Sequence, residues 1–225
     1  MDDTERRTRL IQWLEVIFSD VEDLLLDNHM FWELQEIVRN NRQFAEASGL
    51  FTQWMASAFV QATAVGVRRQ AKANDNSVSL KRFLIEVQKY PSLVSREHYM
   101  SLYEGMEAGL TELGQRDFDR VAGEGSSHLP VTLAEEHLSE LDQAVKKIEH
   151  YVDKRIAHYD KGLLACPTPT FADLSNALKT IEKLVVLYWK LLKGTSMTTM
   201  LSIIPFDWHD IFRFAWVPSP GMERK

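Results

Sequence analysis

The sequence predicts an all-α protein: a single helical bundle of about six or seven helices. Apolar residues recur at spacings of three, four and seven along most of the chain, which is the period of helices that bury one face. Glycine, proline and capping residues interrupt that period, and no segment of convincing length alternates as a strand does. With 225 residues the chain is long enough to bury a substantial core, so we expect one domain over residues 1–225.

The first part of the chain predicts three helices. Two cover residues 4–27 and 29–47, and Gly49 follows at a break because glycine permits the turn that ends a helix. The third, over residues 51–73, is the most apolar. Its alanines and Gly66 would allow other helices to approach closely, so we expect it at the centre of the bundle.

Capping residues and breakers bound the middle of the chain. Ser77 or Ser79 begins a short helix that Pro91 closes, because serine side chains accept hydrogen bonds from the first free backbone N–H groups. A helix over about 96–113 follows. Residues 114–131, which are rich in glycine and serine, predict a loop or hinge.

Two further signals begin long helices in the last part of the chain. The segment from Thr132 to Glu135 has the form of a capping box and predicts a helix over 133–160. A similar segment beginning at Thr170 predicts a last helix that stops at Gly194. Residues 200–217 are rich in aromatic side chains, so this segment either packs back on the bundle, which we favour, or meets a partner.

Composition excludes several classes of protein. The single Cys166 rules out an internal disulfide framework, and no tight histidine and cysteine cluster indicates a zinc site. We expect no cofactor and no metal. The polar N-terminus is not a signal peptide and no apolar run is long enough to cross a bilayer, so we expect a cytoplasmic protein with no membrane contact.

The net charge of −6 argues against indiscriminate binding of nucleic acid, which depends on neutralising phosphates. Acidic residues dominate the first 36 positions, whereas basic residues outnumber acidic ones over residues 37–100. A local basic surface is compatible with this distribution.

The end of the helix predicted over 133–160 carries the densest set of chemically useful side chains. Residues three, four and seven apart share a helix face, so Tyr151, Lys154, Arg155 and His158 are expected to flank the apolar stripe of this helix rather than fill it. Either this is a solvated charged face, or it presents a cation and an imidazole to one ligand atom.

The second interpretation fits cleavage of RNA without a metal. Histidine can move a proton near neutral pH and arginine can stabilise the charge that develops on phosphate. We therefore predict His158 and Arg155 as catalytic residues. Cleavage needs both an acid and a base, and His158 with Arg155 provides only one such group in each chain. We therefore expect a homodimer that pairs two of these helices.

The same region predicts a site for an anion. Lys154 and Tyr151, with Arg68 and Arg69 from the helix over 51–73, are the predicted phosphate-binding residues. The alternative for the arginine pair is that it complements the negative end of its own helix dipole. The cations of the site would then pair with Asp153 or other acids at the surface.

Short segments along the chain resemble the HEPN superfamily, the helical domains associated with RNA and nucleotides. Similarity is greatest to abortive-infection-type HEPN proteins and spans residues from about 50 to 217. The segments that carry it are 153–158 with Asp160, 67–70 with 77–80, 169–174, and 207–208 with 211–213 and Trp216. The resemblance implies a helical fold and an RNA- or nucleotide-associated module of a defence or toxin-type system.

The chain departs from the family at one catalytic position. HEPN ribonucleases carry an arginine roughly four to six residues from the histidine, and the matching positions before His158 are Tyr151, Val152 and Asp153. Arg155 would have to replace that arginine at a shorter spacing. The resemblance therefore leaves two functions open: a metal-independent endoribonuclease, or a catalytically inactive interaction module that acts through a cognate protein partner.

Overall fold

The computed structural model describes residues 2–42, 49–156, 168–201 and 208–213, and within them the prediction of an all-α bundle is confirmed. Six α-helices of seven or more residues appear in these segments. The described residues form no strand, and Ser95 and His128 make an isolated β-bridge.

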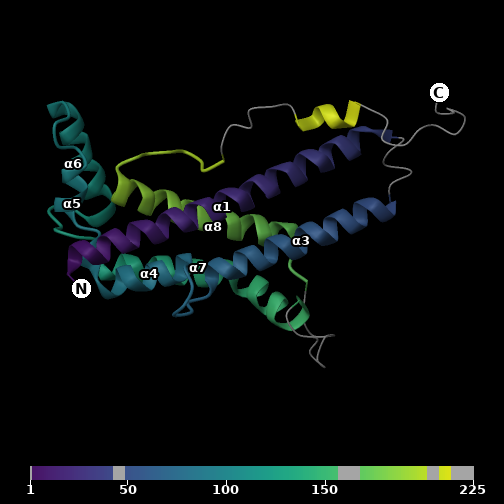
Figure 1. The fold of residues 1–225 in the computed structure, drawn as a ribbon, viewed down its shortest axis with the longest axis horizontal. Helices are drawn as coiled ribbons and strands as arrows, with labels where there is room; N and C mark the ends of the chain where they lie inside the picture. The colour runs from purple at the N-terminus through teal and green to yellow at the C-terminus, as the bar shows by residue number, and fades with distance from the viewer. Residues whose placement is uncertain (1, 43–48, 157–167, 202–207, 214–225) are drawn as a thin grey trace, which may run out of the picture.

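Four long helices build the body of the molecule: α1 (Asp3–Asn40), α3 (Gly49–Ala71), α7 (Val131–Tyr151) and α8 (Phe171–Lys193). Each packs against at least two of the others, and the short α4 (Leu80–Lys89) fits against α1 and α7. Figure 1 shows α5 (Arg96–Ser101) and α6 (Ala108–Ala122) together beyond one end of this body. The N-terminal half of α3 and the C-terminal half of α1 extend at the opposite end.

Three short helical segments complete the described chain. The 3-10 helix η1 (Pro91–Leu93) links α4 to α5, and the π-helix η2 (Val152–Ile156) continues α7 directly. The 3-10 helix η4 (Trp208–Arg213) contacts α1, because the indole N–H of Trp208 donates to a carboxylate oxygen of Glu33 at 2.9 Å. The rest of the aromatic segment over 200–217 lies mostly outside the described residues.

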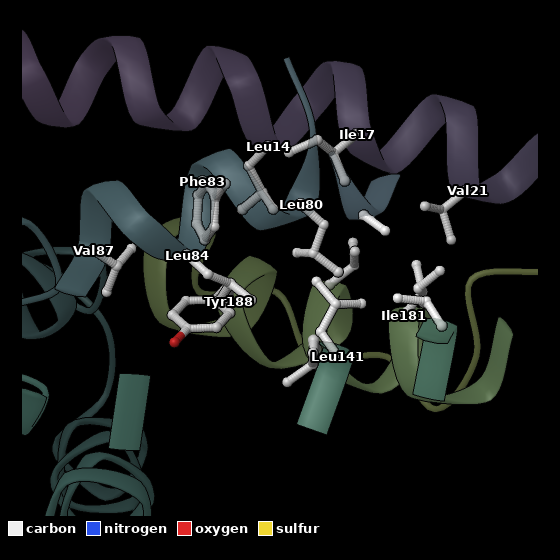
Figure 2. Close-up of a cluster of buried hydrophobic side chains, with 14 of the residues drawn as sticks. Leu14, Ile17, Val21, Leu80, Phe83, Leu84, Val87, Leu141, Ile181 and Tyr188 are labelled. Carbon is white, nitrogen blue, oxygen red and sulfur yellow. The ribbon is translucent and has the colours of Figure 1, made fainter. Parts of the chain in front are cut away.

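The core lies where α1, α4, α7 and α8 meet (Figure 2). Its side chains come from the apolar stripes that the helical period predicts, and most of them are fully buried: Leu14, Ile17, Val21, Leu80, Phe83, Leu84, Val87, Leu141, Ile181 and Tyr188. Burying one such aliphatic side chain contributes roughly 1.5–3 kcal/mol. The bundle therefore draws its stability from this centre.

Only half of α3 occupies the central position expected of it. Its buried residues all lie between Thr63 and Ala71, whereas its first turns are exposed. In the buried half the small residues do allow close packing, because a methyl group at Gly66 would overlap the Leu24 side chain of α1. The expectation of a helix that is central throughout was wrong, since α1 and α3 extend past the helices that cover the other half.

The predicted break near residue 28 does not occur, and α1 runs unbroken from Asp3 to Asn40. No glycine or proline lies in this stretch, so nothing local forces an end. The second half of the helix is held by aromatic packing, with the Phe31 and Phe59 rings stacked at 3.9 Å.

The prediction of one helix over about 96–113 and a loop over 114–131 was also wrong. The first helix ends at Ser101, and Gly105 with a φ of 79° forms the turn before α6. α6 then continues through Gly114, against which the Tyr103 ring packs, and ends at Gly123 with a φ of 93°. Glycine is favoured at such positive φ values because it has no Cβ.

The two predicted capping boxes had different outcomes. Thr170 and Asp173 form theirs, and α8 ends at Gly194 in the left-handed conformation, as predicted. The box from Thr132 to Glu135 does not form, because α7 begins two residues earlier, at Val131, with Pro130 at its N-cap and no side-chain cap. Residues 157–160 of the predicted helix, together with Cys166, lie outside the described residues.

Candidate π-helical site at the end of α7

The end of α7 changes from α-helical to π-helical geometry over Val152–Ile156. π-helical turns are rare and occur often at functional sites, because they insert a residue and turn the following side chains to a new face. This turn packs against the C-terminal part of α3. It therefore brings the predicted residues Lys154 and Arg155, both half-buried, to the junction of α3 and α7.

Tyr151 does not lie where the sequence predicted. Its side chain is 8% exposed and belongs to the hydrophobic core, together with Val152. The expectation that Tyr151 flanks the apolar stripe was wrong, because Tyr151 follows the buried Ile148 by three residues and shares its face of the helix.

An ion cluster joins α3 to the π-helical turn. The Arg68 guanidinium donates to one carboxylate oxygen of Asp153, and the ammonium of Lys72 lies 3.4 Å from the other. Lys72 also lies 3.1 Å from Glu149, one turn earlier on α7. These pairs connect the cations at the end of α3 to the predicted site.

The protonation of Asp153 reflects this cluster. Partial burial opposes ionisation, but the hydrogen bond and charge of Arg68, with the charge of Lys72, hold the pKa of Asp153 below its ordinary value. Asp153 therefore remains a carboxylate near neutral pH. It offsets part of the positive charge at the junction.

Arg69 turns away from this junction, although it neighbours Arg68 in sequence. Its guanidinium makes two hydrogen bonds to Asp20 of α1, and the Gln70 amide donates to the same carboxylate. Gln70 is 2% exposed and also accepts a hydrogen bond from the backbone N–H of Leu80. The structure thus separates the two arginines that the sequence grouped together, because successive residues of a helix point to different faces.

A groove of about 420 Å³ lies between α1 and α3, beside the π-helical turn. We call it the α1–α3 groove, and its lining residues are Asp20, Asp23, Leu24, Asp27, Gln61, Ala62, Val65, Gly66, Arg69 and Ile156. Burial, together with the nearby charge of Asp23, raises the pKa of Asp27. Sequence reasoning missed this groove, although Asp20, Asp23 and Asp27 have the three-and-seven spacing of a shared helix face.

His158, the predicted catalytic imidazole, lies outside the described residues, so its pairing with Arg155 stays a prediction. Within the described segments, no three histidine, cysteine or acidic residues are grouped so that they could hold a metal ion. Nor does any helix in these segments have the length and apolar character needed to span a membrane.

A second imidazole, which the sequence did not single out, lies deep in the bundle. His137 of α7 is 6% exposed, and its Nδ1 is 2.9 Å from the hydroxyl oxygen of Tyr188 on α8. Burial lowers the pKa of His137, so the ring is neutral near neutral pH. The pair joins α7 to α8 within the bundle.

A family model for AbiU2, a HEPN-type abortive-infection family, matches residues 9–215. The chain belongs to the AbiU2 family. This confirms the resemblance, and the match includes the π-helical turn, His158 and the ends of α3 and α7. Searches of curated proteins and of solved structures gave no significant match.

Proposed function

We propose that this AbiU2 chain is an RNA- or nucleotide-associated module of a defence or toxin-type system, and that it binds phosphate at the π-helical end of α7. The observation that carries the proposal is the convergence of cations there. Arg68 near the end of α3 and Lys72, which directly follows α3, meet the turn that contains Lys154 and Arg155. Guanidinium groups bind phosphate with paired donors and ammonium groups bind it as point charges.

The residues at and just after the π-helical turn would supply the groups for RNA cleavage without a metal. His158 would remove the proton of a ribose 2′-hydroxyl, and Arg155 would stabilise the negative charge that develops on the phosphate. Asp153, held by Arg68, anchors the turn that contains Arg155 and precedes His158 in sequence. The membership in a HEPN-type abortive-infection family supports this assignment.

A second function has support of its own: an inactive module that acts through a protein partner. The family's arginine is missing at the expected spacing from His158. Arg69, one of the predicted phosphate ligands, is held by Asp20 in an acidic groove, where RNA would be repelled. In this case the cations at the end of α7 hold the bundle together or meet acidic groups of the partner.

RNA degradation without added metal distinguishes the two functions. The wild-type chain is incubated with single-stranded RNA in the presence of a chelator and compared with His158→Ala. For the ribonuclease we expect cleavage that the variant loses by about 100-fold or more, as is typical when a general acid or base is removed. His150→Ala, which replaces an exposed histidine eight residues earlier in the chain, is the matched control and should cleave as wild type does. Equal rates for wild type and His158→Ala would exclude the catalytic assignment.

A further inference from the structure

Large apolar side chains are exposed together at the start of α6. Leu110 and Leu113 lie three positions apart on this helix, so they share a face, and they are 45% and 54% exposed. Met106, which is 51% exposed, lies in the turn that leads into the helix. We call these three residues the α6 patch. Single exposed apolar residues are common on protein surfaces, whereas neighbouring ones indicate a surface that meets another molecule.

The second half of α6 holds this helix on the rest of the molecule. Phe118 is fully buried, and the carboxylate of Asp117 lies 2.7 Å from the ammonium of Lys190 on α8. Leu110, Leu113 and Asp117 are spaced by three and four positions, so they share one face of α6. The face that meets α8 at Asp117 therefore continues past this contact as the α6 patch. Figure 1 shows α6 beyond one end of the long helices.

Acidic side chains lie close to the α6 patch. Glu104, Glu107 and Glu112 are each within two positions of a patch residue in the sequence, and all three are exposed. Residues 96–124, which contain α5 and α6, hold seven acidic and three basic side chains, so they account for −4 of the net charge of −6. A surface of this charge attracts cationic groups and repels anionic ones.

We propose that the α6 patch binds a basic amphipathic helix of a partner protein. The leucines of the patch already have the spacing of a helix face, which a second helix can match by packing its own apolar ridge against it. Lysine and arginine side chains at the edges of the partner helix would meet the carboxylates of Glu104, Glu107 and Glu112. Apolar contact would then supply affinity, and charge would select the partner.

The charge of this region argues against other occupants. Its carboxylates would repel the phosphates of RNA and the anionic surface of a membrane. A second copy of the chain would bring the same acidic residues to the interface, and like charges placed opposite each other weaken association. A basic helix is the occupant that covers the apolar side chains and also neutralises the carboxylates beside them.

The α6 patch lies far from the π-helical end of α7. Lys190, near the end of α8, meets α6, whereas Asp173, in the first turn of α8, lies 2.9 Å from Lys147 of α7. These two residues of α8 are 17 positions apart, which corresponds to roughly 25 Å along the helix. A partner on α6 would leave the π-helical turn uncovered, so the proposal does not depend on whether RNA binds there.

Two synthetic peptides of about 15 residues test the patch, because shorter peptides form little helix in water. One carries leucine at helical spacing and lysine elsewhere, and the other carries glutamate in place of each lysine. In fluorescence anisotropy with the full chain, we expect the basic peptide to bind about tenfold or more tightly than the acidic one.

Leu113→Gln should weaken binding of the basic peptide about fivefold or more, because it removes an apolar contact. Leu50→Gln, at a leucine of α3 that is 83% exposed, is the matched control and should bind as the wild type does. Equal binding of the two peptides, or equal binding of the basic peptide by wild type and Leu113→Gln, would overturn the proposal.

Removal of two carboxylates tests the charge of the partner without changing the patch itself. Glu104→Gln combined with Glu107→Gln should weaken the basic peptide about threefold or more at roughly 50 mM salt, and less at higher salt, because salt screens exposed charges. Glu135→Gln combined with Glu136→Gln, at exposed positions of α7, is the matched control. The basic partner is refuted if both double variants bind alike, or if sedimentation shows a wild-type dimer that Leu113→Gln dissociates, since a second copy would then occupy the patch.

Discussion

The middle of α7 and its end meet the neighbouring helices in different ways. In the middle, Leu141, Val145 and Ile148 are fully buried. The only polar contact described deep in this region is that of His137 with Tyr188. At the end, Glu149 and Asp153 meet Arg68 and Lys72 in pairs that solvent reaches. Apolar packing holds a helix in one position, whereas exposed ion pairs exchange readily with other charged groups.

This difference separates stability from function along one helix. The middle anchors α7 in the bundle, whereas under the proposed function the cations at the π-helical end would bind a phosphate in place of a carboxylate. Two substitutions and one pH titration measure how much each part of α7 contributes to the free energy of unfolding, and they follow from the largest expected effect to the smallest. RNA binding then tests the function proposed for the end of α7.

Leu141→Ala should lower the free energy of unfolding by about 3 kcal/mol, because it removes a fully buried side chain from the centre of the core and leaves a cavity. Urea denaturation followed by circular dichroism measures the change. A loss below about 1 kcal/mol would mean that the middle of α7 is not the anchor.

The stability of the fold should fall as the pH drops below about 6.5, through His137. Burial lowers the pKa of His137 from 6.5 in the folded chain. The unfolded chain therefore takes up the proton first, and acid favours unfolding until the folded pKa is reached. One such group changes the free energy of unfolding by less than about 1.4 kcal/mol per pH unit.

His137→Gln serves as the comparison, because its amide can still bond the Tyr188 hydroxyl without titrating. Urea midpoints between pH 5 and 8 should vary less in this variant than in the wild type. His98, whose pKa burial also lowers, remains in both proteins and accounts for the slope that is left. Identical slopes would contradict the neutral buried imidazole.

Arg68→Gln should cost the least, less than about 1 kcal/mol, because the Arg68 and Asp153 side chains are 33% and 39% exposed and solvent screens the pair. Added salt should reduce the difference between variant and wild type further. A loss as large as that of Leu141→Ala would remove the contrast between the two parts of α7.

The sequence predicted best where local chemistry decides the structure. α8 follows from its capping box at Thr170 and its terminal Gly194, because both signals act within one turn of the helix. α6 was missed because glycine is only weakly unfavourable in a helix, and the Tyr103 ring packs against Gly114. The local sequence pattern cannot predict such a contact between residues that are distant in the chain.

The candidate site was predicted only in part, because contacts between distant residues complete it. The sequence placed Lys154 and Arg155 near one helix end, and the structure adds the π-helical turn that orients them. It could not show that Arg68 reaches Asp153 while Arg69 reaches Asp20, since these contacts span 85 and 49 positions of the chain. Only the packing of α3 between α1 and α7 decides which arginine faces which carboxylate.

Binding of single-stranded RNA by the wild type and by Arg155→Glu tests the proposed phosphate site most directly. Arg116→Glu, at an exposed arginine of α6 and 39 residues before Arg155, is the matched charge reversal. We expect Arg155→Glu to bind about tenfold or more weakly at roughly 50 mM salt, with a smaller salt dependence, and Arg116→Glu to bind as the wild type does. If all three proteins bind RNA equally weakly at that salt concentration, the π-helical end of α7 is not a phosphate site.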